Sequence, residues 1–412
     1  MSLRILHTAD WHLGKKLDHF SRLEEQKLVM AEICDIADAQ NVDVVIVAGD
    51  LFDTFNPPAE AQDLFYKTLF RLTNNGKRAV VAIAGNHDMP ERVEAPNPLA
   101  EMNGIILCGF PDTEIKPFST DGGIEVTRSE AGFLEIKMAE NQPLLRVIFT
   151  PYANELRLKT YLGMEKKESA LREILEEKWR ELADKYCDSK GVNVLTAHLF
   201  FMKKGEQAEA EPEGEKSILH VGGAQPIFSE NIPKQMQYVA LGHLHRYHSI
   251  DKIPCPIVYS SSPLSYSFAE ADQKKQVVII DLEPGKAAKY EPIPLTQGRG
   301  LTRKEFASIE DAVSWLVENP EVYVEVTIQT DTFLDGTARK QLSQAQNYIV
   351  DVIPKIRLKE GETEEIDPFE IDDSRDMNAL FVEFFNYKNG NEAPPEALLQ
   401  LFKEVISQNS EI

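Results

Sequence analysis

Five short polar stretches of the sequence carry side chains that bind divalent metal ions in proteins. They are Asp10-Trp11-His12, Gly49-Asp50-Leu51-Phe52-Asp53, Gly85-Asn86-His87-Asp88, Ala197-His198 and Gly242-His243-Leu244-His245. Each follows an apolar run, so each lies where a buried strand ends and a loop begins. They offer imidazole, carboxylate and amide oxygen without thiolate, a ligand set suited to Mn²⁺, Fe²⁺ or Zn²⁺ in a catalytic site rather than to a structural zinc.

The number of candidate ligands favours two metal ions over one. The seven candidates are Asp10, His12, Asp50, Asn86, His198, His243 and His245. Asp10 and His12 alternate along what we expect to be extended chain, so both would point to one side, and the two histidines of the last stretch share this spacing. Asp50 is the natural bridge. Two cations ~3.5 to 4 Å apart lower the pKa of a trapped water and hold both oxygens of a displacement at phosphorus, which favours phosphoester hydrolysis.

The remaining histidines differ in their expected roles. His87 lies beside the candidate ligand Asn86 on a loop, where it could protonate the leaving oxygen or bind developing charge. Taken singly, any histidine here is more often a surface or core residue than a ligand, and only the five ordered stretches together reverse that expectation. Structural or surface roles are expected for His7, His19, His220 and His248.

The intervening residues predict the elements that position these side chains. Apolar runs at 3–9, 42–48 and 80–84 predict strands, separated by a helix with a Ser21/Glu24 capping box and by a second helix capped by Asn56-Pro57. This β-α-β-α-β order implies parallel strands, whose ligands lie beyond their carboxyl ends. Further predictions are strands at 146–150, 192–196, 238–241, 257–260 and 276–281, and a charged helix across 155–186.

Four segments are predicted along the chain. The first domain is expected at 1–285, followed by a connecting stretch rich in proline and glycine and a small α/β domain at 290–358. An acidic linker is expected at 359–376, because nine acidic residues face one base between positions 360 and 376. Two short amphipathic stretches within 377–412 predict terminal helices.

Composition limits the classes of function. The 44 Lys and Arg against 67 Asp and Glu give a net charge of −23, which by itself argues against a nucleic-acid partner. Many of these acids fall in the expected linker and in a loop at 206–215, and neither segment need touch a substrate. Four cysteines without CxxC spacing indicate a reducing cytoplasm, and the longest apolar runs are too short for a membrane span.

The ordered set DxH, GDxxD, GNHD, H and GHxH resembles the calcineurin-like metallophosphoesterase superfamily. Longer matches are similar to the SbcD family, the nuclease subunits of bacterial SbcC/SbcD DNA repair complexes, and cover most of the chain. The matching stretches are 7–14, 48–53, 241–246 and Tyr259-Ser260-Ser261-Ser262-Pro263. The resemblance implies a two-sheet αββα sandwich with a small α/β capping domain and C-terminal helices.

The resemblance also implies a division of the ligands and an activity. One Mn²⁺ would be held by Asp10, His12, Asp50 and His245, and the other by Asp50, Asn86, His198 and His243, with His87 catalytic. The implied activities are double-strand exonuclease and single-strand or hairpin endonuclease in DNA repair and recombination, together with an SbcC-like SMC-type ATPase. That partner would bind the C-terminal helices, whose alternative is docking within the chain. The helix from Leu64 to Phe70 and the stretch at Pro98-Leu99 are most simply core packing, but the resemblance implies that they pair two subunits into a homodimer.

Two positions depart from the family pattern. Asp53 stands where archaeal and eukaryotic relatives carry a second catalytic histidine, as in the bacterial form, and we expect it to orient His87. Ser261 stands where the family's YxGSP motif has glycine. Glycine lets another group approach the backbone closely, so the serine puts such an approach at this position in doubt.

Two alternatives to a nuclease share the fold. A small-molecule phosphodiesterase or phosphatase would use the same ligands but would not need the second domain or the terminal helices. A non-catalytic scaffold would typically have lost ligands, and none is lost here. The basic residues nearest the ligand stretches are weak candidates for DNA contacts: Lys15, Lys16, Lys203, Lys204 and Arg246.

Overall fold

The structure is a computed structural model that describes residues 2–138, 142–158, 167–207, 226–271, 273–330, 334, 336–356, 377–388, 393–396 and 398–402. The chain divides into two compact units, Met1–Lys355 and Ile356–Ile412. The expected acidic linker lies outside the described residues, as does most of the acidic loop at 206–215.

A six-stranded sheet carries the first three ligand stretches. Its order is β18-β17-β1-β4-β5-β6. The strands are β1 Leu3–Thr8, β4 Val44–Ala48, β5 Ala79–Ile83, β6 Ile105–Cys108, β17 Gln276–Leu282 and β18 Lys289–Pro294. Strands β1, β4, β5 and β6 are parallel, while β17 and β18 run antiparallel at the edge. The carboxyl ends of β1, β4 and β5 therefore meet at one edge of the sheet.

An eight-stranded sheet carries the other two ligand stretches. Its order is β15-β16-β14-β11-β10-β9-β8-β7. The strands are β7 Phe118–Ser119, β8 Glu125–Glu130, β9 Phe133–Lys137, β10 Leu145–Thr150, β11 Val192–His198, β14 Tyr238–Gly242, β15 His248–Asp251 and β16 Ile257–Tyr259. Strands β10, β11, β14 and β16 are parallel, so β11 and β14 present their carboxyl ends together.

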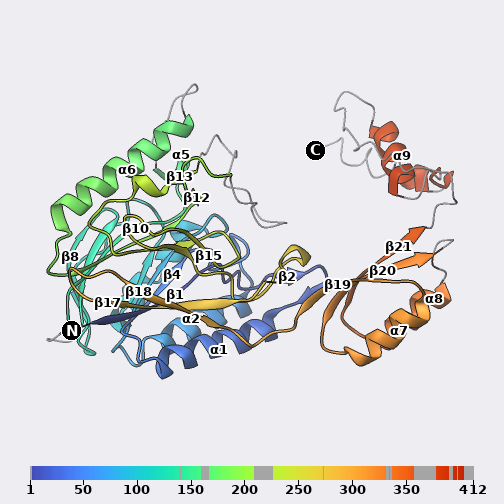
Figure 1. Cartoon of the computed structure of the whole chain (residues 1–412), viewed down its shortest axis with the longest axis horizontal. Helices are drawn as coiled ribbons and strands as arrows, with labels where there is room; N and C mark the ends of the chain where they lie inside the picture. Colours follow the sequence, from blue (N-terminus) through green and yellow to red (C-terminus); the bar gives the residue numbers. More distant parts are fainter. Residues whose placement is uncertain are drawn as a thin grey trace. The chain divides into compact units, whose positions relative to one another are not determined.

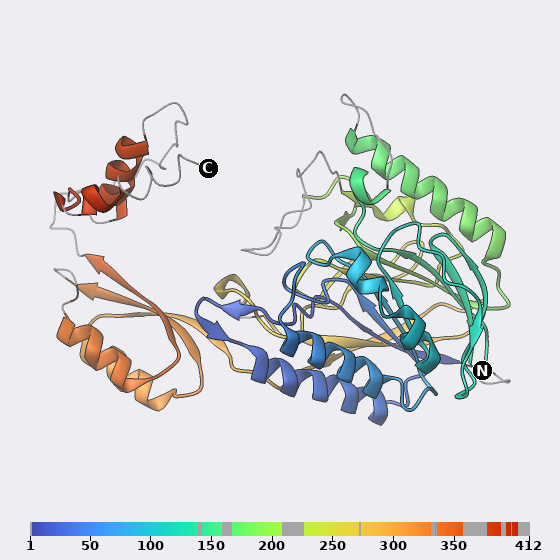
Figure 2. The same ribbon diagram turned by 180° about the vertical axis from the view of Figure 1, so that it is seen from behind.

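Three apolar layers hold the two sheets and their helices together. Helices α1 Leu23–Ala39 and α2 Ala59–Leu72 cover the outer face of the first sheet, and α6 Lys167–Tyr186 covers the outer face of the second (Figures 1 and 2). Between the sheets, β-branched and other apolar residues from both, such as Val81 and Val194, form the central core. The predicted two-sheet αββα sandwich is confirmed.

A smaller α/β element follows the sandwich. Strands β19 Leu301–Phe306, β20 Tyr323–Thr330 and β21 Ile349–Ile356 form a sheet of their own, with α7 Ile309–Glu318 and α8 Gly336–Ala345 packed on it. These elements enclose a separate apolar core. The Ser308 hydroxyl caps α7 by accepting the Asp311 N–H at 3.1 Å.

The second unit contains helix α9 Met377–Lys388 and a short helical stretch at 398–402. The rings of Phe381 and Phe402 stack at 3.9 Å between centroids and join the two helical pieces. Phe384 and Leu401 remain 49% and 56% exposed within this unit. In the described part of the chain, no helix combines the length and apolarity needed to cross a membrane.

Several sequence expectations about the elements are wrong. The stretch expected to link the domains forms β18, so the first sheet extends to Pro294, past the expected boundary at 285. The N-cap of α1 is Arg22 rather than Ser21, and α2 begins at Ala59 after Pro58. The charged helix expected across 155–186 is confirmed, by contrast, at α5 Glu155–Leu158 and at α6, and positions 159–166 lie outside the described residues.

Arg22 takes the N-cap position because its side chain has buried partners. Its guanidinium donates to the Glu25 carboxylate at 2.6 and 3.1 Å and to the Ser265 carbonyl at 2.8 Å. Glu25 also accepts the Tyr323 hydroxyl of β20 at 3.0 Å. A long-range network thus overrides the local capping preference.

Buried His7 should make stability depend on pH. Its Nε2 lies 3.1 Å from the Leu241 carbonyl oxygen and its Nδ1 lies 3.2 Å from the Tyr238 hydroxyl, so a neutral ring bridges the two sheets. Burial lowers the pKa of His7 to about 3. Below about pH 6.5 the unfolded chain therefore binds a proton that the folded chain does not, and stability present above that pH falls on acidification.

We expect His7 to account for a loss of about 2 kcal/mol in unfolding free energy between pH 7 and pH 5. Urea unfolding of the wild type and of His7→Gln, both in EDTA, measures this contribution as the difference between their pH slopes. Equal slopes would contradict the prediction.

Candidate metal centre

The two sheets bring all five ligand stretches to one place. Backbone hydrogen bonds join the loops after β1 and β4, with the Asp10 N–H donating to the Gly49 carbonyl and the His12 N–H to the Asp50 carbonyl, both at 2.9 Å. Across the sheets, the His243 N–H donates to Asp10 Oδ1 at 2.8 Å. The stretch after β14 is thereby tied to the stretch after β1.

The backbone conformation that brings Asp10 and His12 to the same side is not the extended chain that the sequence predicted. Asp10 and His12 do not alternate along extended chain, because β1 ends at Thr8 and both residues have left-handed φ angles of 54° and 42°. Asp50 and His243 also have positive φ, at 48° and 106°. Such conformations cost of order 1–3 kcal/mol each and cluster at functional sites, where surrounding contacts maintain them.

Two glycines allow this close approach. Gly49 has φ +94°, and a Cβ there would lie 2.2 Å from His198 Nδ1. At Gly85, a Cβ would lie 2.1 Å from Asp50 Oδ1. Any larger residue at either position would displace a candidate ligand.

The first cluster of side chains centres on His12. Its Nε2 lies 3.0 Å from His245 Nε2 and 3.5 Å from Asp50 Oδ2. Asp10 joins His12 and His245 in a group whose ligand atoms all lie within 4.8 Å of one another. Four of the predicted ligands therefore surround one small volume.

The second cluster centres on His198. Its Nε2 lies 2.9 Å from Asn86 Oδ1 and 3.3 Å from Asp50 Oδ2. The His198 and His243 rings meet edge to face at 5.6 Å between centroids. Because Asp50 faces both His12 and His198, it lies between the two clusters.

The donor set fits two divalent cations. Asp10 Oδ2 and Asp50 Oδ2 are buried and, among the described residues, have no hydrogen-bond partner. A buried carboxylate oxygen without a partner carries a large desolvation cost that a cation would offset. Imidazole, carboxylate and one amide oxygen are ligands that Mn²⁺, Fe²⁺ and Zn²⁺ accept.

Electrostatics in the cluster also favours added positive charge. Burial raises the pKa of Asp10 to about 7, and the nearby Asp50 carboxylate acts in the same direction. Burial opposes ionisation of Asp50, yet His198 and His12 hold the pKa of Asp50 well below its usual range. Burial lowers the pKa of His198, but Asp50 outweighs it and raises that pKa to about 9.

His87 lies beside the first cluster. Its ring meets the His12 ring edge to face at 4.8 Å, and its Nδ1 lies 2.7 Å from the backbone carbonyl oxygen of Asp53. The Asp53 carboxylate, expected to orient His87, forms a group with ring nitrogens of His87 and His12 whose atoms all lie within 4.8 Å of one another, and it lies 3.2 Å from Lys15 Nζ. The 2.7 Å contact to His87 Nδ1 comes from the main chain of residue 53.

Other side chains that support the cluster were not anticipated. The Asp88 carboxylate accepts the N–H groups of Gly85, Leu51 and Phe52, which joins the loops after β4 and β5. Buried Arg157 donates to the Gly85 and Asp88 carbonyls at 2.8 and 2.7 Å. Asp88 belongs to the GNHD stretch and could have been found there, whereas no local pattern marks Arg157.

Two further residues, Glu270 and Lys275, support His245. Glu270 Oε1 lies 3.1 Å from His245 Nδ1, and Lys275 Nζ donates to Glu270 Oε2 at 2.6 Å. Burial opposes ionisation of Glu270, but His245 and Lys275 lower the pKa of Glu270 to about 2. Both lie in a region without any recognisable motif.

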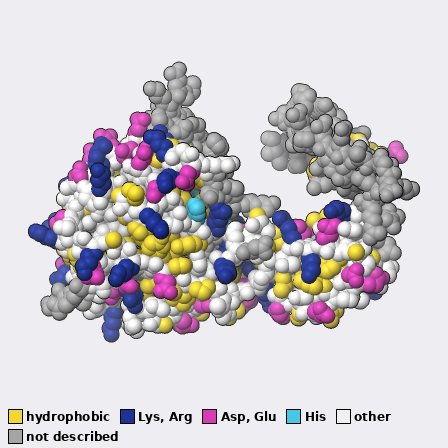
Figure 3. All heavy atoms as spheres, in the orientation of Figure 1, with side chains coloured by type: hydrophobic (Ala, Val, Ile, Leu, Met, Phe, Trp, Pro, Cys, Tyr) yellow, Lys and Arg dark blue, Asp and Glu magenta, His cyan; other side chains and the backbone are white. Residues whose placement is uncertain are grey.

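The candidate DNA-contacting residues lie at varied distances from the cluster. Lys15 is beside Asp53 at its margin, and Lys16 is exposed on β2 Lys16–Leu17. Lys203 and Lys204 follow β12 Phe201–Met202 and face Glu206 and Glu230, while Arg246 is half-buried next to His245. On the face shown in Figure 3, basic and acidic side chains are interspersed over the sandwich.

Ser261 occupies a backbone conformation that glycine prefers. Its φ is +86°, and its Oγ accepts the Gln276 N–H at 3.0 Å and lies 3.1 Å from the Gln276 carbonyl oxygen. These bonds to β17 compensate for the strained backbone, which explains how serine replaces glycine here.

Substitutions at Ser261 should separate strain from hydrogen bonding. Ser261→Ala keeps the left-handed backbone but loses both contacts, and we expect it to lower the unfolding free energy by about 1–3 kcal/mol. Ser261→Gly loses the same contacts but relieves about 1 kcal/mol of strain, so it should be the milder change. Urea unfolding compares them, and a glycine variant less stable than the alanine variant would contradict this account.

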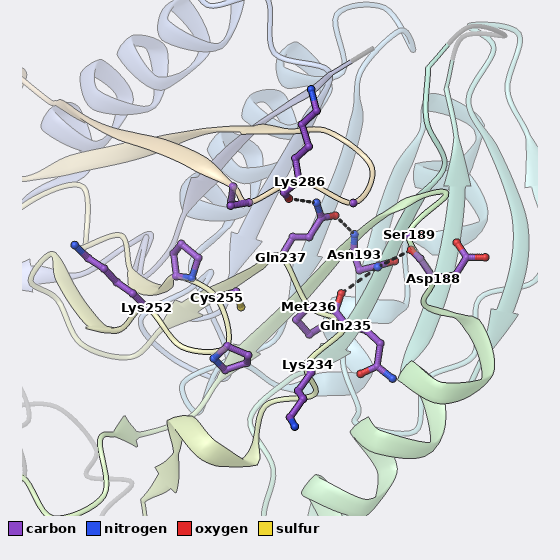
Figure 4. A pocket seen from close by; sticks show the side chains of 15 residues that line it. Asp188, Ser189, Asn193, Lys234, Gln235, Met236, Gln237, Lys252, Cys255 and Lys286 are labelled. Carbon is purple, nitrogen blue, oxygen red and sulfur yellow. Dashed lines mark hydrogen bonds between the residues drawn. The ribbon is translucent and has the colours of Figure 1, made fainter.

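A separate cavity of about 440 Å³ lies at the amino-terminal ends of β11 and β14 (Figure 4). The Gln237 side chain crosses it, accepting the Asn193 N–H and donating to the Glu283 and Lys286 carbonyls. None of the seven predicted ligands lines it, and the two that lie next to these strands, His198 and His243, are at the opposite, carboxyl ends.

Comparisons with known proteins agree with this geometry. Residues 3–247 match the family described as calcineurin-like phosphoesterase. The chain is 34% identical over 411 residues to the SbcD nuclease subunit of Bacillus subtilis (strain 168), covering 98% of each. It is 33% identical to the SbcD subunit of Rhodobacter capsulatus (71% of this chain, 69% of the relative) and 28% identical to that of Escherichia coli K12 (87% and 86%).

Proposed function

The chain belongs to the calcineurin-like phosphoesterase family and to its SbcD nuclease subunits, and from this premise we propose that it cleaves DNA with two bound divalent cations. Members of this family are hydrolases that act on phosphodiester bonds, and so is this nuclease subunit. The proposal rests chiefly on one observation: carboxylates from β1 and β4, with unsatisfied buried oxygens, face imidazoles from both sheets.

We assign the first cation to Asp10, His12, Asp50 and His245 and the second to Asp50, Asn86, His198 and His243. Mn²⁺ is the proposed metal. Bound there, the cations would activate water and neutralise charge on the phosphate. Asp50 would serve both positions, because its Oδ2 lies 3.5 Å from His12 Nε2 and 3.3 Å from His198 Nε2.

His87 is the proposed proton donor to the leaving oxygen. The Asp53 carbonyl oxygen can only accept, so the 2.7 Å contact keeps a proton on His87 Nδ1. To donate from Nε2 the ring must carry a second proton, so His87 would act as the imidazolium and return to the neutral Nδ1–H form after the transfer. The edge-to-face contact with His12 keeps this ring beside the proposed first cation.

The proposed substrates are DNA ends and hairpins, cut by double-strand exonuclease and single-strand endonuclease activity. The test incubates the purified protein and Mn²⁺ with labelled duplex and hairpin DNA and, in parallel, with bis-p-nitrophenyl phosphate. We expect DNA cleavage that EDTA abolishes. Cleavage of the small ester but never of DNA, even with the partner ATPase, would instead favour a small-molecule phosphodiesterase.

We also propose that two copies pair through the helices beside the first sheet. Apolar side chains there are unusually exposed: Tyr66, Phe70, Leu99 and Met102 are 38%, 53%, 72% and 70% exposed. Large apolar side chains exposed on helices are typical of an interaction surface. Analytical ultracentrifugation should find a dimer that Leu99→Asp dissociates and Leu156→Asp, on α5, does not; a wild-type monomer at micromolar concentration would refute pairing.

The C-terminal unit is the proposed attachment for an SbcC-like SMC-type ATPase in the cytoplasm. Exposed Phe384 and Leu401 suit a partner that covers an apolar helix face. Deleting residues 380–412 should abolish co-purification with that ATPase while Mn²⁺-dependent cleavage by the isolated subunit persists. Phe384→Asp with Leu401→Asp in the full chain should act likewise, and retained binding by these variants would refute the assignment.

A further inference from the structure

A buried ion pair lies directly behind one of the proposed ligands. Glu270 is 2% exposed at the end of the short 3-10 helix Phe268–Glu270, and Lys275 is 8% exposed just before β17. Burying two charges is costly, and an apolar pair of similar volume is often as stable. The pair therefore calls for an explanation beyond stability.

The carboxylate determines how the His245 ring is protonated. Glu270 Oε1 can only accept, so its 3.1 Å contact places the imidazole proton on Nδ1. The lone pair of Nε2 is then directed at the first cluster, where Nε2 lies 3.0 Å from His12 Nε2. This tautomer is the one that can bind a cation there.

Lys275 holds both the carboxylate and the histidine backbone. Its Nζ donates to Glu270 Oε2 at 2.6 Å, to the His245 carbonyl oxygen at 2.7 Å and to Ser262 Oγ at 3.0 Å. The Ser262 N–H donates to the same His245 carbonyl at 3.1 Å. His245 is therefore fixed at its ring and at its main chain by one connected network.

The second cluster is supported differently. His198 Nδ1 lies 2.9 Å from the backbone carbonyl of Ala48, a neutral acceptor. Both histidines thus present Nε2 to the site, but only His245 has a carboxylate at hydrogen-bond distance from Nδ1, since Asp10 Oδ1 lies 3.8 Å from His198 Nδ1. A carboxylate partner raises the basicity of a ligating imidazole more than a carbonyl does.

We propose that Glu270, held by Lys275, is a positioning residue that orients His245 and selectively strengthens the cation position shared with Asp10 and His12. This inference rests on the proposed two-cation function and adds that Glu270 strengthens cation binding at one position and not at the other. In Glu270→Gln, the amide oxygen turns toward Lys275 and its NH₂ group toward His245 Nδ1. The ring then carries its proton on Nε2, where it blocks cation binding.

The test measures Mn²⁺ binding by calorimetry and electron paramagnetic resonance with the full chain. Glu270→Gln should weaken one of two cation positions by about 10–100-fold and leave the other unchanged. Nitrogen-15 NMR of the histidines in EDTA should show one ring changing from the Nδ1–H to the Nε2–H tautomer. Cleavage should recover toward the wild-type rate at saturating Mn²⁺.

A second variant guards against misfolding. Glu270→Leu with Lys275→Met removes both buried charges and the acceptor of His245 Nδ1, and it should still bind one cation at least about tenfold more weakly. Glu283→Gln with Lys286→Met removes an exposed pair of the same types and should bind as the wild type does. Two wild-type affinities in the Glu270 variants, or equal weakening of both positions, would overturn the proposal. A wild type that binds no Mn²⁺ would instead overturn the proposed function.

Discussion

His87→Ala is expected to cleave DNA about 10²–10⁴-fold more slowly than the wild type while still binding two cations. The residue is 4% exposed beside the first cluster, and its Nδ1 is held by the Asp53 carbonyl at 2.7 Å. Removing the ring deletes the proposed proton donor without deleting any assigned ligand. The slower rate should therefore persist at saturating Mn²⁺.

Single-turnover cleavage and Mn²⁺ stoichiometry separate the two possible roles of His87. His19→Ala is the matched control, because the His19 side chain is 64% exposed and lies between β2 and β3 Phe20–Ser21. A variant that loses one cation together with its activity would make His87 a ligand rather than the proton donor.

Asp50→Asn should lose both cations and all measurable cleavage. Asp50 Oδ1 accepts the His87 N–H at 2.9 Å, and Oδ2 faces the Nε2 atoms of His12 and His198. An asparagine has only one side-chain oxygen, so its NH₂ group must face either the His87 N–H or those imidazoles. Neither orientation reproduces the two acceptor oxygens of the carboxylate. Residues that hydrogen-bond to a metal ligand already contribute about 10–100-fold to metal affinity. A ligand shared by both cations should therefore contribute more than about a hundredfold.

Thermal unfolding with and without Mn²⁺ checks this expectation. A ligand that binds only the folded state raises the melting temperature, so Mn²⁺ should stabilise the wild type and leave Asp50→Asn unchanged. Asp63→Asn, an exposed position on α2, should behave as the wild type does. An Asp50→Asn variant still stabilised by Mn²⁺ would contradict the bridging role.

Much of the site was visible in the sequence. Asp10, Asp50 and Asn86 follow apolar runs that become β1, β4 and β5, and residue type with spacing was enough to nominate them. Strands buried on both faces are encoded by short-range hydrophobic pattern, which can be read without knowing the neighbours. The fold class followed from the same patterns and from family resemblance. Cation binding itself stays a prediction.

Other features depended on contacts between distant segments. The left-handed turns at Asp10 and His12 exist because the loops after β1 and β4 bond to each other, and β18 joins the first sheet only by pairing with β17. In the sequence, nothing distinguishes Glu270 and Lys275 from ordinary surface residues. Only the tertiary structure shows that both contact His245. Local sequence encodes burial and turn preference, whereas the partner of a buried charge is chosen by how the two sheets pack.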